Sequence, residues 1–491
     1  MTILQAFDWN LPVNHALWNR LKSASGSLKK LGFDAVWLPP AYKNSATNGV
    51  GYGPYDLYDL GEFDQKGSVP TKYGTKAEYL AAISELQKSG LQVLADIVLN
   101  HRLGADEPES VVATPVDSED RLRPLGEPRE ISAWTKFNFP GRGDKYSDFK
   151  WDKSCFTSVS YDGNTNEEGV FLFSGKKFAS KVAHEKNNFD YLMGADIDLN
   201  NLAVREELLN WGKWYVKTTG IDGFRFDALK HIGSDFLAWW LTELRHISPL
   251  FAIGEYWSGD VRELEYYLDK VGNQLSLFDA PLHFNFYSAS HSMSDYDLGG
   301  IFNGSLLNSR PDRAITFVDN HDTEPRESLN SWVDGWFKNH AYAIILLRGL
   351  GTPCVFYGDL YGIPSIDINP VPALPLMLKL RERYAYGKLR DYFDDRHVVG
   401  FTRAGDDKHP HSGLAVVLNN SDASAKHMTL GPVHKNQTMV EVLHGADPMS
   451  AFPRTVTLDE HGSAIFPVPA GNVSIWTTPD AAKTLFISLR S

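Results

Sequence analysis

The sequence predicts an α/β protein built on a (β/α)8 TIM barrel, with an irregular β-rich insertion after the third strand and a C-terminal all-β sandwich domain. Three observations support this fold class. Eight short apolar runs alternate with helical patterns, residues 100–203 interrupt that alternation, and helical patterns stop after about residue 390. Apolar runs that alternate with helices are typical of buried parallel strands, and eight such units close most economically into a barrel.

The expected barrel strands share a high content of β-branched and aromatic residues. They are residues 3–9, 35–40, 92–100, 223–228, 251–257, 276–282, 314–320 and 352–358. An open doubly wound sheet is the competing arrangement, but no glycine-rich phosphate-binding motif follows the first strand. We therefore expect a closed barrel.

Helical spacing is clearest in the segment just before the fourth expected strand. Val204, Leu208, Trp211 and Tyr215 recur at i, i+4, i+7 and i+11, which places them on one face of a helix. Similar patterns occupy residues 75–90, 234–247 and 259–272. These patterns divide the chain into four expected segments. They are 1–99 (first part of the barrel), 100–203 (insertion), 204–390 (second part of the barrel) and 391–491 (C-terminal β-sandwich).

Composition excludes several functional classes. The chain of 491 residues has a net charge of -13 and no basic block, which argues against a nucleic-acid partner and an anionic membrane surface. Cys155 and Cys354 are expected to be free thiols, as in a reducing compartment. The N-terminus lacks a signal-peptide pattern, and the apolar run 341–347 is too short to span a bilayer. We expect a cytoplasmic monomer.

Charged residues gather where the expected strands end. Asn100 and His101 end the third strand, Arg225 and Asp227 lie on the fourth, Glu255 ends the fifth, and residues 319–322 (Asp-Asn-His-Asp) end the seventh. Barrel enzymes carry their active sites at the carboxyl ends of the strands. Several acids on one rim repel each other, so this cluster indicates function rather than structural stability.

The motifs DIVLNH, GFRFDALKH, GEYW and FVDNHD resemble, in order, the four conserved blocks of the α-amylase family of retaining glycoside hydrolases (family 13). The segments GYGPYDLYDLGEF, TKYGTK and FPGRGDKYSDFKW are similar to the bacterial liquefying-type and intracellular members. This resemblance covers nearly the whole chain. It implies endo-acting hydrolysis of α-1,4-glucosidic bonds in starch, glycogen or malto-oligosaccharides, through a double displacement that retains the anomeric configuration.

The resemblance also implies residue roles. Asp227 is the expected nucleophile, Glu255 the general acid and base, and Asp322 a third acid that holds sugar hydroxyls. Arg225 lies two residues before Asp227 on the same strand, so both side chains point to one face and the arginine would keep the nucleophile ionised. The expected substrate-binding residues are Tyr52, His101, Arg225, Lys230, His231, Trp257 and His321.

One Ca²⁺ ion is expected by the same resemblance. Its ligands would be Asn100, Asp190, Asp196 and the backbone carbonyl of His231, all hard oxygen donors. The liquefying enzymes add further ions, but Thr157 and Ala179 stand here at two of the corresponding positions, so only one ion is carried over.

Two alternatives to hydrolysis remain open in the sequence. A 4-α-glucanotransferase would use the same three acids, and a sugar hydroxyl would then replace water. A non-catalytic transporter-associated relative is a second alternative, but such relatives have lost catalytic acids, and Asp227, Glu255 and Asp322 are all present. A pure starch-binding module would not need the three acids either. For the enzyme, the expected partner is its α-glucan substrate.

Overall fold

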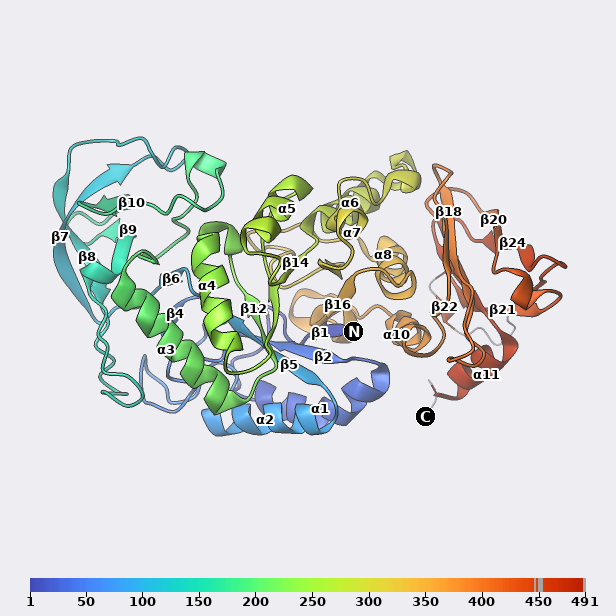
Figure 1. The fold of residues 1–491 in the computed structure, drawn as a ribbon, viewed down its shortest axis with the longest axis horizontal. Helices are drawn as coiled ribbons and strands as arrows, with labels where there is room; N and C mark the ends of the chain where they lie inside the picture. The colour runs from blue at the N-terminus through green and yellow to red at the C-terminus, as the bar shows by residue number, and fades with distance from the viewer. Residues whose placement is uncertain (446, 449–453, 489–491) are drawn as a thin grey trace.

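A computed structural model describes residues 1–445, 447–448 and 454–488 (Figure 1). Its centre is a closed barrel of eight parallel strands, which confirms the predicted fold class. In order around the barrel these are β1 (Ile3–Gln5), β16 (Thr352–Phe356), β15 (Ala314–Phe317), β14 (Ser276–Phe278), β13 (Phe251–Gly254), β12 (Gly223–Phe226), β5 (Gln92–Ile97) and β2 (Ala35–Leu38). Each strand falls within one of the eight expected runs.

The strands are shorter than the runs because the polar end of each run leaves the sheet. Asp227 directly follows β12 and Glu255 directly follows β13, while His101 lies four residues beyond β5. The barrel interior is filled by buried apolar side chains, as in other barrels of this kind. The polar residues therefore collect on one rim, where the strands end.

Helices surround the barrel (Figure 1). The longer ones are α1 (Leu17–Leu31), α2 (Lys76–Lys88), α3 (Leu202–Thr219), α4 (Ser234–Arg245), α5 (Val261–Lys270), α6 (Ala280–Ser292), α8 (Gly335–Leu347) and α10 (Leu374–Arg383), and the shorter ones are α7 (Leu306–Ser309) and α9 (Tyr357–Tyr361). The four expected helical patterns correspond to α2, α3, α4 and α5. Helix α3 begins after Asn201, whose side chain caps it, and ends at Gly220, which adopts a left-handed φ of 66°.

Between β5 and α3, the chain forms a separate six-stranded sheet at the end of the molecule opposite the C-terminal sheet (Figure 1). Its strands, in sheet order, are β6 (His101–Arg102), β11 (Ala195–Ile197), β9 (Phe156–Asp162), β10 (Glu167–Phe173), β7 (Glu107–Val116) and β8 (Arg129–Lys136). Strand β6 begins four residues after barrel strand β5 ends and pairs with β11, which shortly precedes α3. The insertion thus starts and ends beside the rim that carries the polar residues.

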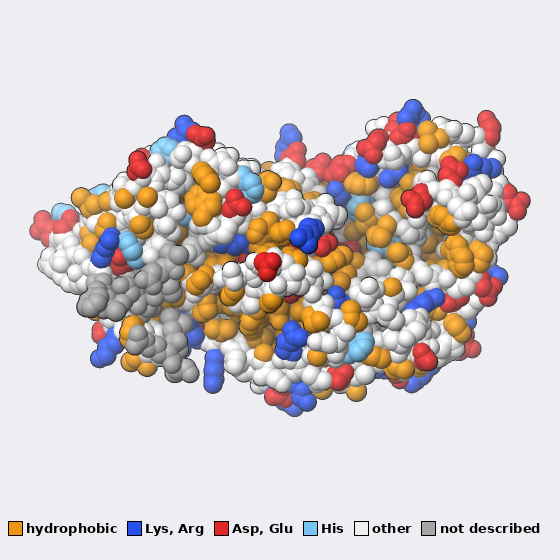
Figure 2. All heavy atoms as spheres, turned by 180° about the vertical axis from the view of Figure 1, so that it is seen from behind, with side chains coloured by type: hydrophobic (Ala, Val, Ile, Leu, Met, Phe, Trp, Pro, Cys, Tyr) orange, Lys and Arg blue, Asp and Glu red, His pale blue; other side chains and the backbone are white. Residues whose placement is uncertain are grey.

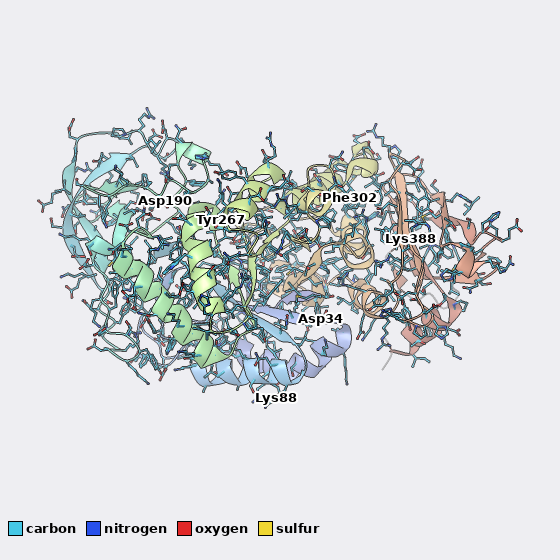
Figure 3. All side chains as sticks on the ribbon, in the orientation of Figure 1. Asp34, Lys88, Asp190, Tyr267, Phe302 and Lys388 are labelled. Atoms are coloured by element: carbon cyan, nitrogen blue, oxygen red, sulfur yellow. The ribbon has the colours of Figure 1, made fainter. Side chains whose placement is uncertain are left out.

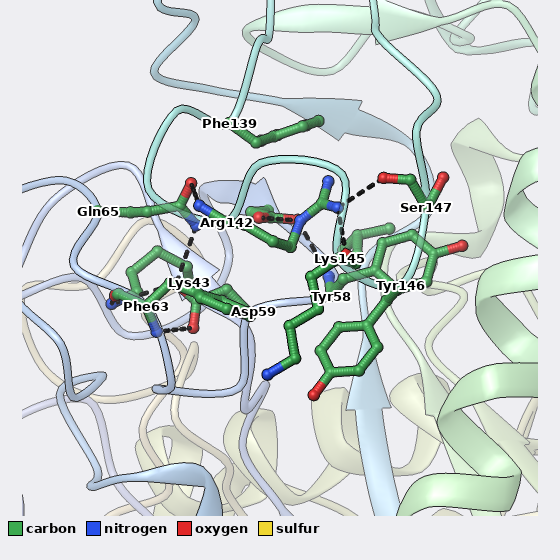
Figure 4. Close-up of polar contacts among 12 residues, drawn as sticks. Lys43, Tyr58, Asp59, Phe63, Gln65, Phe139, Arg142, Lys145, Tyr146 and Ser147 are labelled. Carbon is green, nitrogen blue, oxygen red and sulfur yellow. Dashed lines mark hydrogen bonds and ion pairs between the residues drawn. The ribbon is translucent and has the colours of Figure 1, made fainter.

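A buried ion pair fastens the insertion to the segment that follows barrel strand β2, and a second pair lies within that segment (Figure 4). Nε of Arg142, in the insertion, lies 2.7 Å from Oδ2 of Asp56 on β4 (Pro54–Asp56), and both side chains are only 1% exposed. Gln65 donates hydrogen bonds to both Asp56 and Asp59, and Lys43 on β3 (Lys43–Asn44) lies 3.4 Å from Asp59. Because each buried charge has a partner of opposite sign, this network fixes one position of the insertion.

The C-terminal region forms a second β structure with its own apolar cluster. One sheet contains β17 (Leu389–Tyr392), β18 (Val398–Arg403), β19 (Leu414–Asn419), β25 (Val473–Thr477), β21 (Thr438–His444) and β22 (Asp447–Pro448), with β23 (Thr455–Thr457) on β21; β20 (Ser424–Thr429) and β24 (Ser463–Val468) form a separate pair. The prediction of an all-β segment missed one helix, α11 (Pro479–Ser488), which buries Ala481 and Leu485.

Surface charge and hydropathy agree with the composition. On the face drawn in Figure 2, acidic and basic side chains are interspersed rather than gathered into a basic stripe. No helix in the described part of the chain is long and apolar enough to cross a membrane. Cys155 and Cys354 are both buried and free, as predicted.

Candidate active site

A cleft of about 300 Å³ opens at the carboxyl ends of the barrel strands, beside the insertion. We call it the active-site cleft. It is lined by Trp9, Tyr52, His101, Phe189, Leu192, Met193, Asp227, Ala228, Lys230, His231, Glu255, Trp257, Asp322, Ser328 and Leu329. Eight residues with a predicted catalytic or substrate-binding role are in this set. The other two, Arg225 and His321, lie buried directly behind it, each at most 1% exposed.

Arg225 connects the acids of the cleft. Its Nη1 lies 2.7 Å from Oδ1 of Asp227, and its Nη2 lies 2.6 Å from Oε2 of Glu255. The parallel register explains this arrangement, because Arg225 on β12 is level with Ile253 on β13. Asp227 and Glu255 each lie two residues farther on, so their side chains emerge at the same height. One guanidinium can therefore contact both carboxyl groups.

Asp96 is a third carboxylate on the same guanidinium, and the sequence analysis missed it. It lies on β5 level with Arg225, and its Oδ1 is 3.0 Å from Nη1 of the arginine. Its Oδ2 also accepts hydrogen bonds from Tyr52 and Trp37. Asp96 is completely buried. A single acid inside an apolar run was the available signal, since such a residue needs a buried partner.

Burial and neighbouring charges shift the pKa values of the acids of the cleft. Desolvation raises the pKa of Glu255; Arg225 lowers it, and the negative charge of Asp227 raises it further. For Asp227, desolvation also raises the pKa, whereas Arg225 and a hydrogen bond with Glu255 lower it. One guanidinium serves both carboxyl groups, and the negative charge of Asp227 favours the protonated form of Glu255. The site therefore favours a protonated Glu255 next to an ionised Asp227.

Asp322 enters the cleft from the loop after β15. The Asn320 side chain accepts hydrogen bonds from the backbone N–H groups of Asp322 and Thr323, which forms the turn that presents Asp322. Desolvation raises the pKa of Asp322 well above its usual value, and the charge of Glu255 raises it further. Asp322 has no direct ion pair with Arg225. Its carboxyl group is thus positioned for a ligand rather than for the arginine.

The parallel rings of Trp9 and Tyr52 form a wall of the cleft beside the acids, and the ring of His321 lies buried against them. Tyr52 stacks on His321 with ring centroids 5.0 Å apart and an interplanar angle of 8°. Trp9 lies 5.9 Å from Tyr52 at an angle of 4°, and it was not predicted as a site residue. Its position, four residues after β1, was the signal, since that strand also ends on this rim. Such a wall suits the apolar face of a sugar ring.

The three histidines of the site are neutral and each has a fixed tautomer. Burial lowers the pKa of His101 to about 4 and that of His231 to about 3, and it lowers the pKa of His321 well below its usual value. His101 donates from Nε2 to the Tyr52 carbonyl at 2.9 Å, and His231 donates from Nδ1 to the Phe189 carbonyl at 2.6 Å. The other nitrogen of each ring is therefore an acceptor.

His321 has the same tautomer as His101, the reverse of His231, and Gln5 determines it. The amide Nε2 of Gln5 donates to the Phe7 carbonyl at 3.2 Å and lies 3.1 Å from Nδ1 of His321. Because the carbonyl requires a donor, the amide nitrogen is the atom that faces the ring, and Nδ1 must accept. Nε2 then carries the proton. It lies 3.3 Å from Oδ2 of Asp322 but makes no hydrogen bond to any described residue, so it is free to donate to a ligand.

Lys230 and Trp257 line one wall of the cleft together. Lys230 Nζ donates to the Trp257 carbonyl at 3.2 Å and forms an ion pair with Glu185 of the insertion at 3.1 Å. Trp257 packs edge-on against Phe284, with centroids 5.5 Å apart. The lysine thus connects the insertion to the barrel in addition to facing the cleft.

The predicted calcium ligands lie outside the cleft lining, apart from His231. Asp190 and Asp196 are 5% and 1% exposed, and desolvation raises the pKa of both, to about 7 for Asp190. The charge of Asp198 raises both pKa values further, and that of Asp190 adds to the shift of Asp196. Asp190 accepts from the backbone N–H of Ala179, and Asp196 accepts from Thr157. Within the described ranges, no group of three or more His, Cys, Asp or Glu side chains is arranged to hold a metal. The predicted calcium set contains only two of these side chains, Asp190 and Asp196, because its other ligands are the Asn100 amide and the His231 backbone carbonyl.

Gln5 provides a test of the histidine assignment. In Gln5→Leu, His321 loses the donor that fixes its tautomer, and we expect kcat/KM to fall roughly tenfold, which corresponds to one hydrogen bond. The matched control is Gln92→Leu, at an exposed position on β5, which should leave kcat/KM unchanged. Nitrogen-15 NMR should find Nδ1 of His321 unprotonated in the wild-type protein. A protonated Nδ1 would show that the assignment is wrong.

The chain is similar to a known family model and to several relatives over most of its length. Residues 26–404 match the family model described as the alpha amylase catalytic domain. The chain is 46% identical to an α-amylase of Geobacillus stearothermophilus (97% of this chain, 86% of the relative) and 44% identical to a glucan 1,4-alpha-maltohexaosidase of Bacillus sp. strain 707 (97% and 92%). It is 41% identical to the cytoplasmic α-amylase of Escherichia coli K12 (97% and 98%).

Solved structures share the fold at lower sequence identity. The α-amylase of Geobacillus thermoleovorans, in complex with acarbose, superposes with a TM-score of 0.63 at 19% identity and covers 97% of both chains. The family model extends over more than two thirds of the chain, and the relatives above are aligned over nearly all of it. The chain therefore belongs to the α-amylase family of glycoside hydrolases.

Proposed function

We propose that the protein hydrolyses internal α-1,4-glucosidic bonds of starch, glycogen or malto-oligosaccharides by a retaining double displacement. The observation that carries this proposal is the pair of carboxyl groups held by Arg225, one favoured as the ion and the other as the acid. A retaining glycosidase needs such a pair. The names of the relatives, α-amylase and maltohexaosidase, support the substrate class.

In the first displacement, Asp227 attacks the anomeric carbon and the bond to the leaving oxygen breaks. Glu255 gives its proton to that oxygen, and a glycosyl ester on Asp227 remains. Arg225 supports both roles, since its contact keeps Asp227 ionised before the attack. In the second displacement, Glu255 removes a proton from water, which attacks the anomeric carbon and releases Asp227. Two inversions restore the α configuration.

The surrounding residues bind the sugar at the cleavage point. Asp322 and the free Nε2–H of His321 face the same place, so they suit an acceptor and donor pair for adjacent hydroxyl groups. Tyr52 offers the face of its ring, which Asp96 orients through the phenol hydroxyl. His101, His231, Lys230 and Trp257 complete the cleft wall. Hydrogen bonds that strengthen as the sugar ring distorts would stabilise the transition state relative to the bound substrate.

Maltoheptaose distinguishes hydrolysis from transfer and tests the stereochemistry. We expect only shorter chains, and proton NMR in the first minutes should detect the α-anomer at new reducing ends. Asp227→Asn should lower kcat by several orders of magnitude while the protein stays folded. Chains longer than seven sugars as main products would instead support the glucanotransferase. An initial β-anomer, or a tenth of normal activity in Asp227→Asn, would contradict the proposed roles.

We also propose one bound Ca²⁺ ion, held by Asn100, Asp190, Asp196 and the His231 carbonyl. The fit rests on the two buried carboxylates, whose hydrogen-bond donors are neutral groups, the Ala179 N–H and the Thr157 hydroxyl. Uncompensated buried carboxylates fit a hard cation. Nearby Asp198 differs, because Lys176 lies 2.7 Å from it and already supplies a positive charge. This pairing supports one ion rather than a larger cluster. The ion would stabilise the fold without taking part in the chemistry.

Removal of calcium provides the test of this site. Chelator-treated protein should have a lower melting temperature. Titration with calcium should restore the melting temperature, because an ion that binds only the native state contributes about 4 kcal/mol at a thousand times its Kd. The metal content should reach close to one ion per chain. Asp196→Asn should abolish the calcium-dependent shift, and Asp144→Asn, at an exposed surface pair, should retain it. No bound calcium would contradict the site, and two or more tight ions would contradict the role given to Lys176.

A cytoplasmic location is part of the proposal as well. The similarity to the cytoplasmic α-amylase of Escherichia coli, over nearly the full length of both chains, and the two free buried thiols support it. The monomeric state stays a prediction.

A further inference from the structure

A second cavity, of about 280 Å³, lies between the insertion and helix α5, behind one wall of the active-site cleft. We call it the tyrosine pocket, since Tyr256, Tyr266 and Tyr267 line it together with Lys181, His184 and Lys270. Figure 3 labels Tyr267 on α5, on the side of the barrel toward the insertion. None of the residues assigned to catalysis, sugar binding or calcium lines this pocket.

One short extended segment separates the tyrosine pocket from the active-site cleft. Glu255 and Trp257 line the cleft, and Tyr256 between them lines the tyrosine pocket. Neighbouring side chains of an extended segment point to opposite sides, which explains this division. The other wall is shared too, because the N–H of Ala183 donates to the carbonyl of Lys230 at 2.8 Å. The pocket therefore adjoins the cleft on the side of Lys230 and Trp257.

The side chains of the tyrosine pocket suit a polyhydroxyl ligand. Tyr256 packs against Tyr267 with centroids 5.1 Å apart, and Tyr266 is 59% exposed at the mouth. The hydroxyl groups of Tyr256 and Tyr266 make no hydrogen bond to any described residue. Burial raises the pKa of Tyr256, so its hydroxyl stays a neutral donor. Exposed aromatic faces with free hydroxyl groups can stack on a sugar ring and bond its hydroxyls.

Charge in the pocket favours a neutral ligand over an anion. Lys181 is paired with Asp235 at 3.4 Å, and Lys270 lies over the ring of Tyr266, 5.0 Å from its centroid. The carboxylates of Glu263 and Glu185 act on Tyr256 from nearby. Lys181 is thus paired with an acid and Lys270 rests on an aromatic ring, whereas a phosphate site needs unpaired positive charge that converges on the ligand.

We propose that the tyrosine pocket is an accessory binding site for a neutral α-glucan chain. It holds a part of the polymer outside the active-site cleft, on the side of Lys230 and Trp257, and stacking on Tyr266 provides its main contact. This inference rests on the proposed function, because it assigns the same substrate class to a second place on the surface. A short oligosaccharide that fills only the cleft would not use it.

Tyr266→Ala tests the proposal by kinetics. We expect kcat/KM on soluble starch to fall about two- to tenfold, the loss of one aromatic stacking contact, with kcat/KM on maltotriose unchanged. Tyr266→Phe should keep most of the starch activity, since it keeps the ring. The matched control is Tyr361→Ala, at a 46% exposed tyrosine on α9 outside both pockets, which should behave as the wild type. Equal starch activity in Tyr266→Ala and Tyr361→Ala, or an equal loss on maltotriose, would overturn the proposal.

Binding without turnover separates this inference from the proposed activity. In an Asp227→Asn background, electrophoresis through a gel that contains soluble starch should retard the protein. Adding Tyr266→Ala should reduce the retardation, and adding Tyr361→Ala should not. Unchanged retardation with Tyr266→Ala would overturn the accessory site even if the wild type hydrolyses starch. Conversely, a wild-type protein that does not cleave starch, but whose retardation depends on Tyr266, would contradict the proposed activity and leave the accessory site in place.

Discussion

The buried guanidinium of Arg225 is the interaction on which the active site depends. It contacts Asp96, Asp227 and Glu255 from a position with no exposure to solvent. Burial of one such charge without partners would cost several kcal/mol, and burial of three acids without a cation would cost more. The arginine therefore makes the acid cluster compatible with a folded barrel. It also lowers the pKa of both Asp227 and Glu255, against the desolvation that raises them.

The barrel supplies the alignment that this interaction needs. Parallel register places Asp96 and Arg225 level on neighbouring strands, and it places Asp227 and Glu255 level two residues farther on. Residues that follow the strands add the remaining groups, including the Tyr52 and Trp9 rings and the loop that carries Asp322. The insertion closes one side through Glu185 and Lys230. The fold therefore fixes the acids rigidly and leaves the loops to shape the sugar-binding surface.

Sequence patterns predicted the features with local causes. Apolar runs predicted all eight barrel strands, and the ends of these runs predicted that Asp227 and Glu255 lie on the same rim of the barrel. Residues whose importance comes from distant partners were missed: Asp96 acts through Arg225, 129 positions away, and Gln5 through His321, 316 positions away. Neither partnership leaves a periodic signal. The pairing of Lys176 with Asp198 and the tyrosine pocket likewise depend on how the insertion packs, which no single segment encodes. Helix α11 was missed because it follows a run of strands.

The most direct measurement of the central claim is the pH dependence of kcat/KM in Arg225→Lys. Lysine keeps one positive charge but cannot contact three carboxylates at once. Arg225 lowers the pKa of both Asp227 and Glu255, so its loss should raise both. For variant protein with a wild-type circular-dichroism spectrum, we expect the acidic and alkaline limbs to move to higher pH and the maximum to fall by orders of magnitude. An unshifted profile with near-normal kcat/KM would contradict the account, since the carboxyl groups would then be set by something other than this guanidinium.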